Sequence, residues 1–260
     1  MFPSLGWILE DSPGMEFKTK EEFVAEHLRE GILAGRYPRG IRLKQVDIAQ
    51  DLDLSITPVR EAFRILEAEG YILSEKHRGV IVAPFDASAT HEITGLRVLL
   101  ETHLALTAMD HMRTADLAAL GDLQREFELA SARMDREAVR AINYRFHRQL
   151  YAIARLPQAL HFVQVLWAKY PFDLINRIDG RPGRAAAEHL RLLKAIKARD
   201  RAAVATMLRR HIDTGWQELQ VHIDQQRDVI ETDTTHRRPK LRAPPVPATI
   251  VRPMNAKKRG

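Results

Sequence analysis

Three histidines in the second half of the chain could bind one metal ion together. His147 lies in NYRFHRQL, His189 in AAEHLRLLKAIKARD and His211 in MLRRHIDTGW. Asn143 precedes His147 by four residues, so both side chains share one face of a helix. Imidazoles from three helices of one bundle could converge on a divalent ion, with zinc as first candidate and nickel or manganese as alternatives. Spacing alone does not distinguish this site from ordinary packing or surface roles.

A second candidate for chemistry is the stretch SITPVREAFRILEAEG at residues 55–70. Ser55 suits an N-cap, because its hydroxyl can accept a free backbone N–H. Pro58 then falls in the first turn, where its missing N–H costs little, and Gly70 ends the helix. The apolar positions at helical spacing are Val59, Ala62, Phe63 and Leu66. The outer face carries Thr57, Arg60 and Arg64, side chains that can contact phosphate or base edges.

The elements around this helix predict a small N-terminal domain over residues 18–84. Helical patterns cover 18–35, 45–52 and 55–70, and the short β-branched runs 71–74 and 79–82 predict a hairpin. Three helices and a hairpin are the plan of a winged helix-turn-helix, whose third helix enters the major groove of DNA. Further basic residues expected on the DNA side are Arg36, Arg39, Arg42, Lys44, Lys76, His77 and Arg78.

The rest of the chain predicts an all-helical bundle over residues 88–230, joined to the first domain by a linker at 83–87. Helical patterns cover 88–112, 114–132, 135–155, 157–176, 184–199 and 201–229. The three histidines fall on three of these helices. The expected fold class is therefore mainly α, a winged helix-turn-helix followed by an all-α bundle.

Composition bounds the class of protein. The 260 residues are 45% hydrophobic, and the absence of cysteine excludes disulfides and thiolate ligands. The net charge of +6 arises in residues 231–260, because residues 1–230 hold 32 side chains of each sign. We expect that tail to be disordered and residues 1–17 to be an N-terminal extension. No apolar run reaches the length of a membrane span and no signal peptide is evident, so we expect a cytoplasmic protein that does not enter the membrane.

The first domain resembles the DNA-binding domain of GntR-type bacterial transcription regulators. The resemblance rests on TPVREA (57–62), L-x-x-E-G ending at Gly70 and a G-x-x-V wing from Gly79. It implies that Arg60 and the wing at His77–Gly79 contact operator DNA, and Ser55 belongs to the same candidate surface. Two positions depart from the family pattern: Ile56 stands where an arginine is common, and Val46 where some members have a basic DNA contact.

The helical domain resembles the effector domain of the FadR subfamily, the FCD type. The matching pieces are L-R-x-x-L-E (96–101), N-x-x-F-H (143–147), E-H-x-x-L-L-x-A-I-x-x-R-D (188–200) and His211. The resemblance implies a metal held by Asn143, His147, His189 and His211, and an effector carboxylate bound by Arg97. Four neutral ligands would leave the charge of the ion uncompensated and favour a small organic acid. It also implies a homodimer, with a repressor favoured over an activator.

Alternatives remain open at this point. Arg97 could simply pair with Glu101 on one helix. The aromatic residues Trp167, Tyr170 and Trp216 could line the pocket or belong to an ordinary core. A three-histidine ion could also serve a metal-dependent hydrolase, although no H-E-x-x-H motif is present and Glu188, next to His189, is expected to face elsewhere. A DNA-binding dimer whose bundle is purely structural is the third possibility.

Overall fold

The computed structural model describes residues 19–175 and 178–236, with side chains up to Asp224. Residues up to His222 form one compact unit, and a second begins at Ile223. Helix α10 (Arg201–His236) continues into the second unit and includes residues 231–236, where we expected disorder. The reason is local, because no glycine or proline interrupts this stretch before Pro239. The expected N-terminal extension at 1–17 and the remainder of the tail lie outside the described residues.

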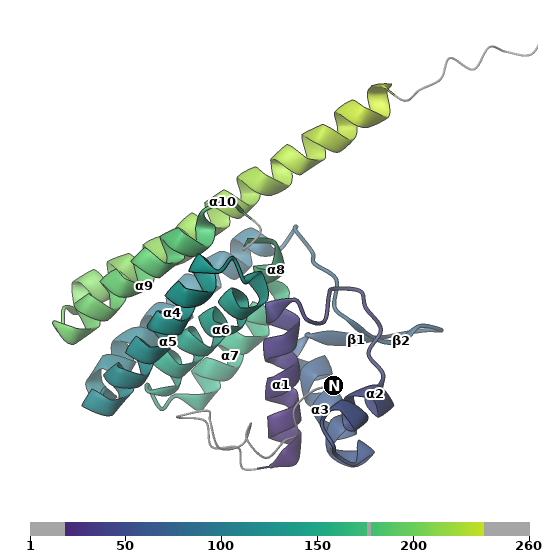
Figure 1. The fold of residues 1–260 in the computed structure, drawn as a ribbon, viewed down its shortest axis with the longest axis horizontal. Coiled ribbons are helices and arrows are strands. Elements are labelled where there is room, and N and C mark those ends of the chain that lie inside the picture. The colour runs from purple at the N-terminus through teal and green to yellow at the C-terminus, as the bar shows by residue number, and fades with distance from the viewer. Residues whose placement is uncertain (1–18, 176–177, 237–260) are drawn as a thin grey trace, which may run out of the picture. The chain divides into compact units, whose positions relative to one another are not determined.

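The N-terminal domain has the predicted winged helix-turn-helix fold (Figure 1). Its elements are α1 (Lys20–Ala34), α2 (Gln45–Asp51), α3 (Ile56–Glu69), β1 (Ile72–Glu75) and β2 (Gly79–Val82). The two strands pair antiparallel, with Ile72 opposite Val82 and Glu75 opposite Gly79. Arg42 adds a bridge to Ile81, which fixes the base of the hairpin to the chain before α2.

The ends of α3 show which sequence signals operate. Gly70 ends the helix in the left-handed conformation, with φ 83°. Ser55 stands at the N-cap as predicted, but the expected capping hydrogen bond from its hydroxyl is absent from the described structure. An N-cap side chain accepts from the second or third helical residue, and the third here is Pro58, which has no N–H. The exposed hydroxyl of Ser55 therefore remains available to a partner outside the chain.

The second domain is all helical, as predicted. Its elements are α4 (Thr90–His111), α5 (Thr114–Ala132), α6 (Arg136–Ala152), α7 (Pro157–Lys169), α8 (Phe172–Ile175), α9 (Arg181–Lys197) and α10. The single helix expected over 157–176 is two helices, because Pro171 lacks an N–H and holds Tyr170 in extended backbone. In the described part of the chain, no helix is both long and apolar enough to cross a membrane.

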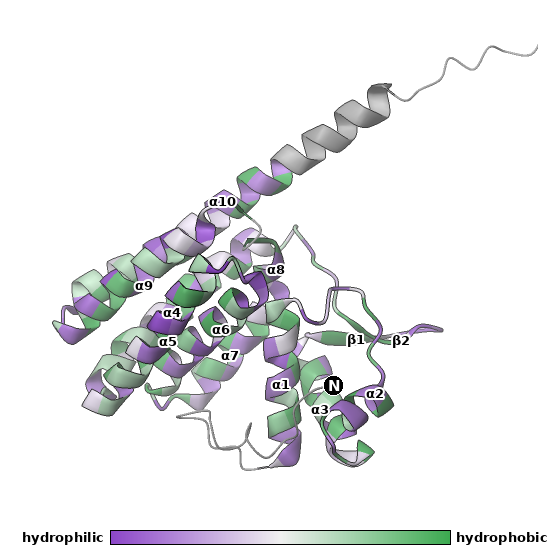
Figure 2. Cartoon of the chain, viewed as in Figure 1, coloured by the Kyte–Doolittle hydropathy of each residue, from purple (hydrophilic) through white to green (hydrophobic). Residues whose placement is uncertain are grey.

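The two domains share one continuous core, and apolar and polar residues alternate along the helices that enclose it (Figure 2). A buried polar network crosses their junction. Arg29 on α1 donates two hydrogen bonds of 2.7 Å to Glu69 on α3 and one of 2.9 Å to Glu26. Tyr144 on α6 donates to Glu26 at 2.8 Å, and Arg148 lies 2.6 Å from the same carboxylate. Helix α1 is therefore bonded to α3 on one side and to the bundle on the other.

Candidate functional site

The structure brings His147, His189 and His211 together from α6, α9 and α10. One ring nitrogen from each lies within 4.8 Å of the others. The Nε2 atoms of His147 and His189 are 3.2 Å apart. Two ligands on a tetrahedral zinc, at about 2.0–2.1 Å from the ion, lie about 3.3 Å apart. The spacing of these two nitrogens therefore fits one shared ion.

Neighbouring side chains fix which nitrogen of His147 can bind a metal. Tyr151 donates its hydroxyl proton to Glu101 at 2.8 Å. Its oxygen then accepts from Nδ1 of His147, 3.2 Å away. With the proton on Nδ1, Nε2 carries the lone pair and points toward His189. This carboxylate–tyrosine–histidine chain is the kind of support that orients metal-binding imidazoles.

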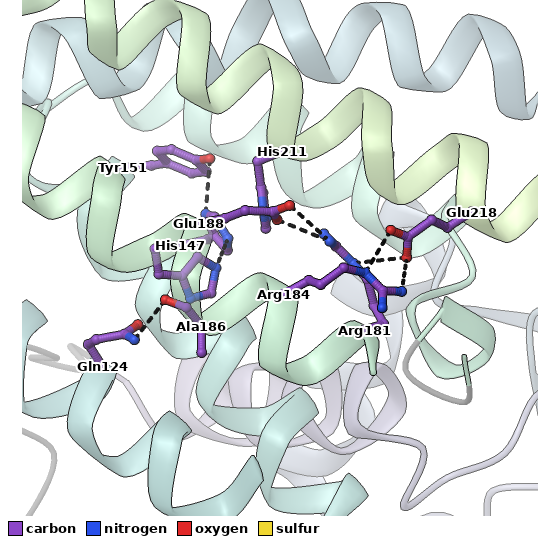
Figure 3. A network of polar contacts seen from close by, with 10 residues as sticks. Gln124, His147, Tyr151, Arg181, Arg184, Ala186, Glu188, His211 and Glu218 are labelled. Carbon is purple, nitrogen blue, oxygen red and sulfur yellow. Dashed lines mark hydrogen bonds and ion pairs between the residues drawn. The ribbon is translucent and has the colours of Figure 1, made fainter. Parts of the chain in front are cut away.

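Glu188 supports His211 in the same way, which corrects our expectation that it faces elsewhere. Its Oε2 lies 2.6 Å from Nδ1 of His211, and the same carboxylate accepts from Arg181 at 3.0 Å (Figure 3). A helix turns about 100° per residue, so adjacent residues on α9 can face different parts of one cluster when α10 packs against both. The lone pair on Nε2 of His211 is left for a ligand.

Burial keeps the three imidazoles neutral. It lowers the pKa of His147 and of His189 well below the ordinary value, and the neighbouring histidines and Arg181 lower it further. Burial also lowers the pKa of His211, against the opposing effect of Glu188. Nδ1 of His189 is buried without a hydrogen-bond partner in the described structure. This is the ring nitrogen other than the Nε2 that faces His147. Neutral imidazoles are the form that binds a metal ion.

A small cavity of about 30 Å³ opens beside the histidines. Asn143 lines it together with His147 and His211, as the spacing of Asn143 and His147 predicted. The other lining residues are Leu33, Arg97, Glu101, Arg140, Tyr144, Trp167 and Phe172. An adjoining small cavity shares Arg97, Asn143 and His211 and adds Tyr170 and Arg181. Trp216 lines neither cavity.

Arg97 pairs with Glu101 and also lines both cavities, and its contact with an effector carboxylate stays a prediction. Its Nε donates to Glu101 at 2.7 Å, and the two side chains are only 7% and 1% exposed. Its guanidinium carbon lies 4.3 Å from the ring centre of Tyr170 and 4.9 Å from that of Phe172. Glu101 also accepts from Trp167 at 3.0 Å. Arg97 is thus a fixed cation on the wall of both cavities.

The predicted DNA-contacting residues of α3 are exposed, namely Ser55, Thr57, Arg60 and Arg64. Glu61 pairs with Arg64 at 3.0 Å and with Arg60 at 3.7 Å. Both arginine side chains are more than half exposed. Exposed ion pairs of this kind contribute little and can be exchanged for phosphate. At the wing, His77 and Gly79 have φ values of 70° and 76°, and Arg78 pairs with Glu75. His77 and Arg78 are exposed, and their contact with DNA stays a prediction.

The basic residues before α2 divide between two roles. Arg42 and Lys44 are exposed, and the guanidinium of Arg42 packs against Gly79 of the wing. Arg36 instead reaches α6, where it bonds to Glu137 at 3.0 Å. Arg39 is a junction residue and not part of the basic surface. It donates to the carbonyls of Ala83 and Tyr170 and to other groups of the bundle.

Comparison with known proteins gives a consistent result. Family models match as "Bacterial regulatory proteins, gntR family" over residues 20–82 and "FCD domain" over residues 92–214. The HTH-type transcriptional regulator McbR of Escherichia coli (strain K12) is 27% identical over 188 residues, 68% of this chain and 82% of that protein. A probable D-xylose utilization operon transcriptional repressor of Paenarthrobacter nicotinovorans is 29% identical over 70% of this chain and 80% of that protein.

Solved structures share the fold. E. coli McbR/YncC matches with a TM-score of 0.69 and 23% identity, over 80% of this chain and 100% of that chain. A putative transcriptional regulator GntR from Rhodococcus sp. RHA1 matches with a TM-score of 0.60 and 24% identity, over 77% and 98%. The proteins matched in both comparisons are described as regulators and not as enzymes.

Proposed function

The chain belongs to the GntR family of bacterial DNA-binding transcription regulators and carries an FCD domain. From this premise we propose that it is a repressor whose operator affinity is controlled by a small carboxylate effector bound near a divalent metal ion in the helical domain. The observation that carries the proposal is the convergence of three neutral imidazoles beside a cavity that holds a buried arginine. The hydrolase alternative is set aside, because the relatives are regulators and Glu188 is engaged by His211.

The metal would be held by His147, His189 and His211, with the amide oxygen of Asn143 as fourth ligand. These are nitrogen and neutral oxygen donors, which suit zinc first and nickel or manganese next. The chain has no cysteine to offer a thiolate. A bound ion would supply positive charge and an open position for an oxygen ligand. Tyr151 and Glu188 would keep His147 and His211 in the tautomer that the ion needs.

The effector would be a small organic acid. Arg97 presents a buried guanidinium to both cavities and stacks on Tyr170 and Phe172, which leaves its outer edge for a carboxylate. A guanidinium can bind a carboxylate through two parallel hydrogen bonds. The positive charge of an ion held by neutral ligands would add to this attraction. Uncharged compounds, which carry no carboxylate or similar anion, would gain neither the contact with Arg97 nor the attraction of the ion.

On DNA, the protein would act as a homodimer in the cytoplasm, where the chromosome lies. Two α3 helices would enter major grooves at half-sites spaced by about one helical turn, about 34 Å. The linker at 83–87 would relay the state of the bundle to α3, because Arg39 donates both to the carbonyl of Ala83 in the linker and to that of Ala168 near the end of α7. The repressor named among the relatives supports repression as the direction of control. An effector acts only through a difference in affinity between two arrangements of the dimer.

The test uses the separate roles proposed for the two domains, DNA binding by the first and metal and effector binding by the second. The operator would be obtained by selecting duplexes from a random pool, and binding measured by fluorescence anisotropy at one salt concentration. We expect Arg60→Ala to weaken binding by about 10–100-fold, in line with about 1–3 kcal/mol for a base contact. Its metal content should match that of wild type, and exposed Arg209→Ala, on α10, is the matched control.

The same measurement with His189→Ala completes the test. We expect this variant to lose metal and the response to carboxylates while it still binds DNA. Loss of DNA binding and of metal together in Arg60→Ala would refute the assignment of separate roles. A protein that binds the operator but neither metal nor carboxylate would favour a purely structural bundle.

A further inference from the structure

The exposed large apolar side chains of the N-terminal domain lie in one region. Among the residues that the structure describes there, they are Ile41, just before α2, Val46, the second residue of α2, and Ile56, the first residue of α3. Exposed apolar residues scattered singly over a surface are ordinary. These three instead lie at or shortly before the starts of the two helices that a helix-turn-helix directs toward DNA.

Ile56 lies on the exposed side of α3, next to an arginine. It is 45% exposed. Arg60 follows it by one helical turn, so the two side chains project from the same side of the helix. The buried side of α3 is formed by other residues, namely Val59, Ala62, Phe63, Leu66 and Glu69. A helix that enters a major groove with its N-terminal residues first therefore brings Ile56 to the DNA together with Arg60.

The chemistry of the Ile56 side chain selects its partner in the groove. It has no hydrogen-bond donor or acceptor, so it cannot replace the water bound to a phosphate or to the polar edge of a base. Covering such a polar group without a hydrogen bond is costly. The apolar group that base pairs display in the major groove is the 5-methyl group of thymine. Contact with this methyl group removes apolar surface from water on both sides.

We propose, on the basis of the operator binding by α3 proposed above, that Ile56 contacts a thymine methyl group in each half-site and sets the base preference there. The position of this thymine follows from the geometry of the helix. Four residues rise by about 6 Å along a helix axis, and successive base pairs are about 3.4 Å apart. The thymine therefore lies within about two base pairs of the base that Arg60 contacts.

Replacing thymine by deoxyuridine removes only the methyl group and so tests the contact directly. In the operator selected from a random pool, each half-site thymine would be replaced one position at a time, and binding of the full-length protein measured by fluorescence anisotropy. Burial of one methyl group changes affinity by about threefold. We therefore expect one position at which wild type binds about threefold more weakly. The loss should reach about tenfold when both half-sites are changed, because separate positions add.

Substitutions assign this loss to one side chain. Ile56→Ala should bind the thymine duplex and the deoxyuridine duplex equally well. Val46→Ala is the matched control, because it shortens a similarly exposed apolar side chain on α2, and it should keep the wild-type loss. Ile56→Val keeps a branched side chain and should keep part of the loss.

Ile56→Arg gives a readout that a purely structural role would not change. A guanidinium binds O6 and N7 of guanine. A new selection with this variant should therefore yield guanine in place of thymine at the sensitive position. The bases at the other positions, including the one that Arg60 contacts, should stay the same. Thymine selected again at that position by Ile56→Arg would contradict the inference.

Other results would overturn this inference and leave the proposed function intact. They are operator binding without any deoxyuridine-sensitive position, a loss that persists in Ile56→Ala, and a loss that is abolished by Val46→Ala. The proposed function fails separately. If wild type selects no duplex, or if Arg60→Ala binds the operator as tightly as wild type, α3 does not read the operator, and this inference fails with it.

Discussion

Glu188 is the side chain whose replacement best tests how the histidine cluster is organised. Its carboxylate holds Nδ1 of His211 at 2.6 Å and accepts from Arg181 at 3.0 Å. Burial raises the pKa of Glu188, but the bonds from His211 and Arg181 outweigh it and hold the pKa below its ordinary value. The group is therefore an anion at neutral pH. It orients His211 and compensates the guanidinium of Arg181, which lines the adjoining cavity.

The size of the effect follows from these two contacts. Glu188→Ala removes a charge-assisted hydrogen bond, worth about 1.5–3 kcal/mol, and leaves Arg181 without its closest partner. Loss of such a supporting group costs about 10–100-fold in metal affinity, and the uncompensated guanidinium places Glu188→Ala near the upper limit. Glu188→Gln keeps a hydrogen-bond acceptor and loses the charge, so we expect its zinc affinity to fall by about tenfold. Wild type should therefore bind zinc most tightly, Glu188→Gln less tightly and Glu188→Ala most weakly.

Zinc affinity would be measured by competition with a fluorescent chelator at pH 7.5. Glu218→Gln is the matched control, because Glu218 pairs with Arg184 at 2.8 Å and lies 3.9 Å from Arg181 without touching a histidine. It should bind zinc within about threefold of wild type. If Glu188→Ala binds zinc as tightly as the control, the carboxylate does not support the cluster and the tautomer argument fails for His211.

Two further predictions concern stability. Glu69→Ala removes two of the hydrogen bonds of buried Arg29 and leaves it with Glu26. We expect this change to lower the free energy of unfolding in urea by about 3–5 kcal/mol, and a loss below about 1 kcal/mol would contradict the prediction. Burial, with Arg36 adding to it, lowers the pKa of His27 from 6.5 to about 4, so the unfolded chain takes up a proton that the folded chain refuses. Stability is therefore lost as pH falls from about 6.5 to 4, by about 2 kcal/mol after screening by solvent is allowed for. His27→Gln should remove this part of the pH dependence. If the free energy of unfolding of wild type and of His27→Gln changed with pH at the same slope, the prediction would be refuted.

Much of the architecture could be predicted because it depends on local signals. The spacing of apolar residues, Gly70 and the β-branched runs placed α3 and the wing within a residue or two. The placement of Asn143 and His147 on one wall followed from four-residue spacing on a helix. The failures near these elements also have local causes, since the hydroxyl of Ser55 lost its target to Pro58 and the helix over 157–176 broke at Pro171.

The roles that could not be predicted are carried by contacts between distant parts of the chain. Glu188 meets His211 across 23 residues, and Arg140 meets Ala34 across 106. Arg39 appeared to belong to a basic surface, but its partners lie in the bundle. Such pairings depend on how α6, α9 and α10 pack. The spacing of Arg140 from Asn143 was the one local signal that could have drawn Arg140 into the site.

The most direct test of the account is the metal content per chain of gently purified protein, measured by elemental mass spectrometry on wild type and His189→Ala. The account predicts about one zinc, nickel or manganese per chain in wild type and none in the variant. No metal in either protein would contradict it. His147, His189 and His211 would then be polar residues of an ordinary core, and any ligand of the cavity would bind without an ion.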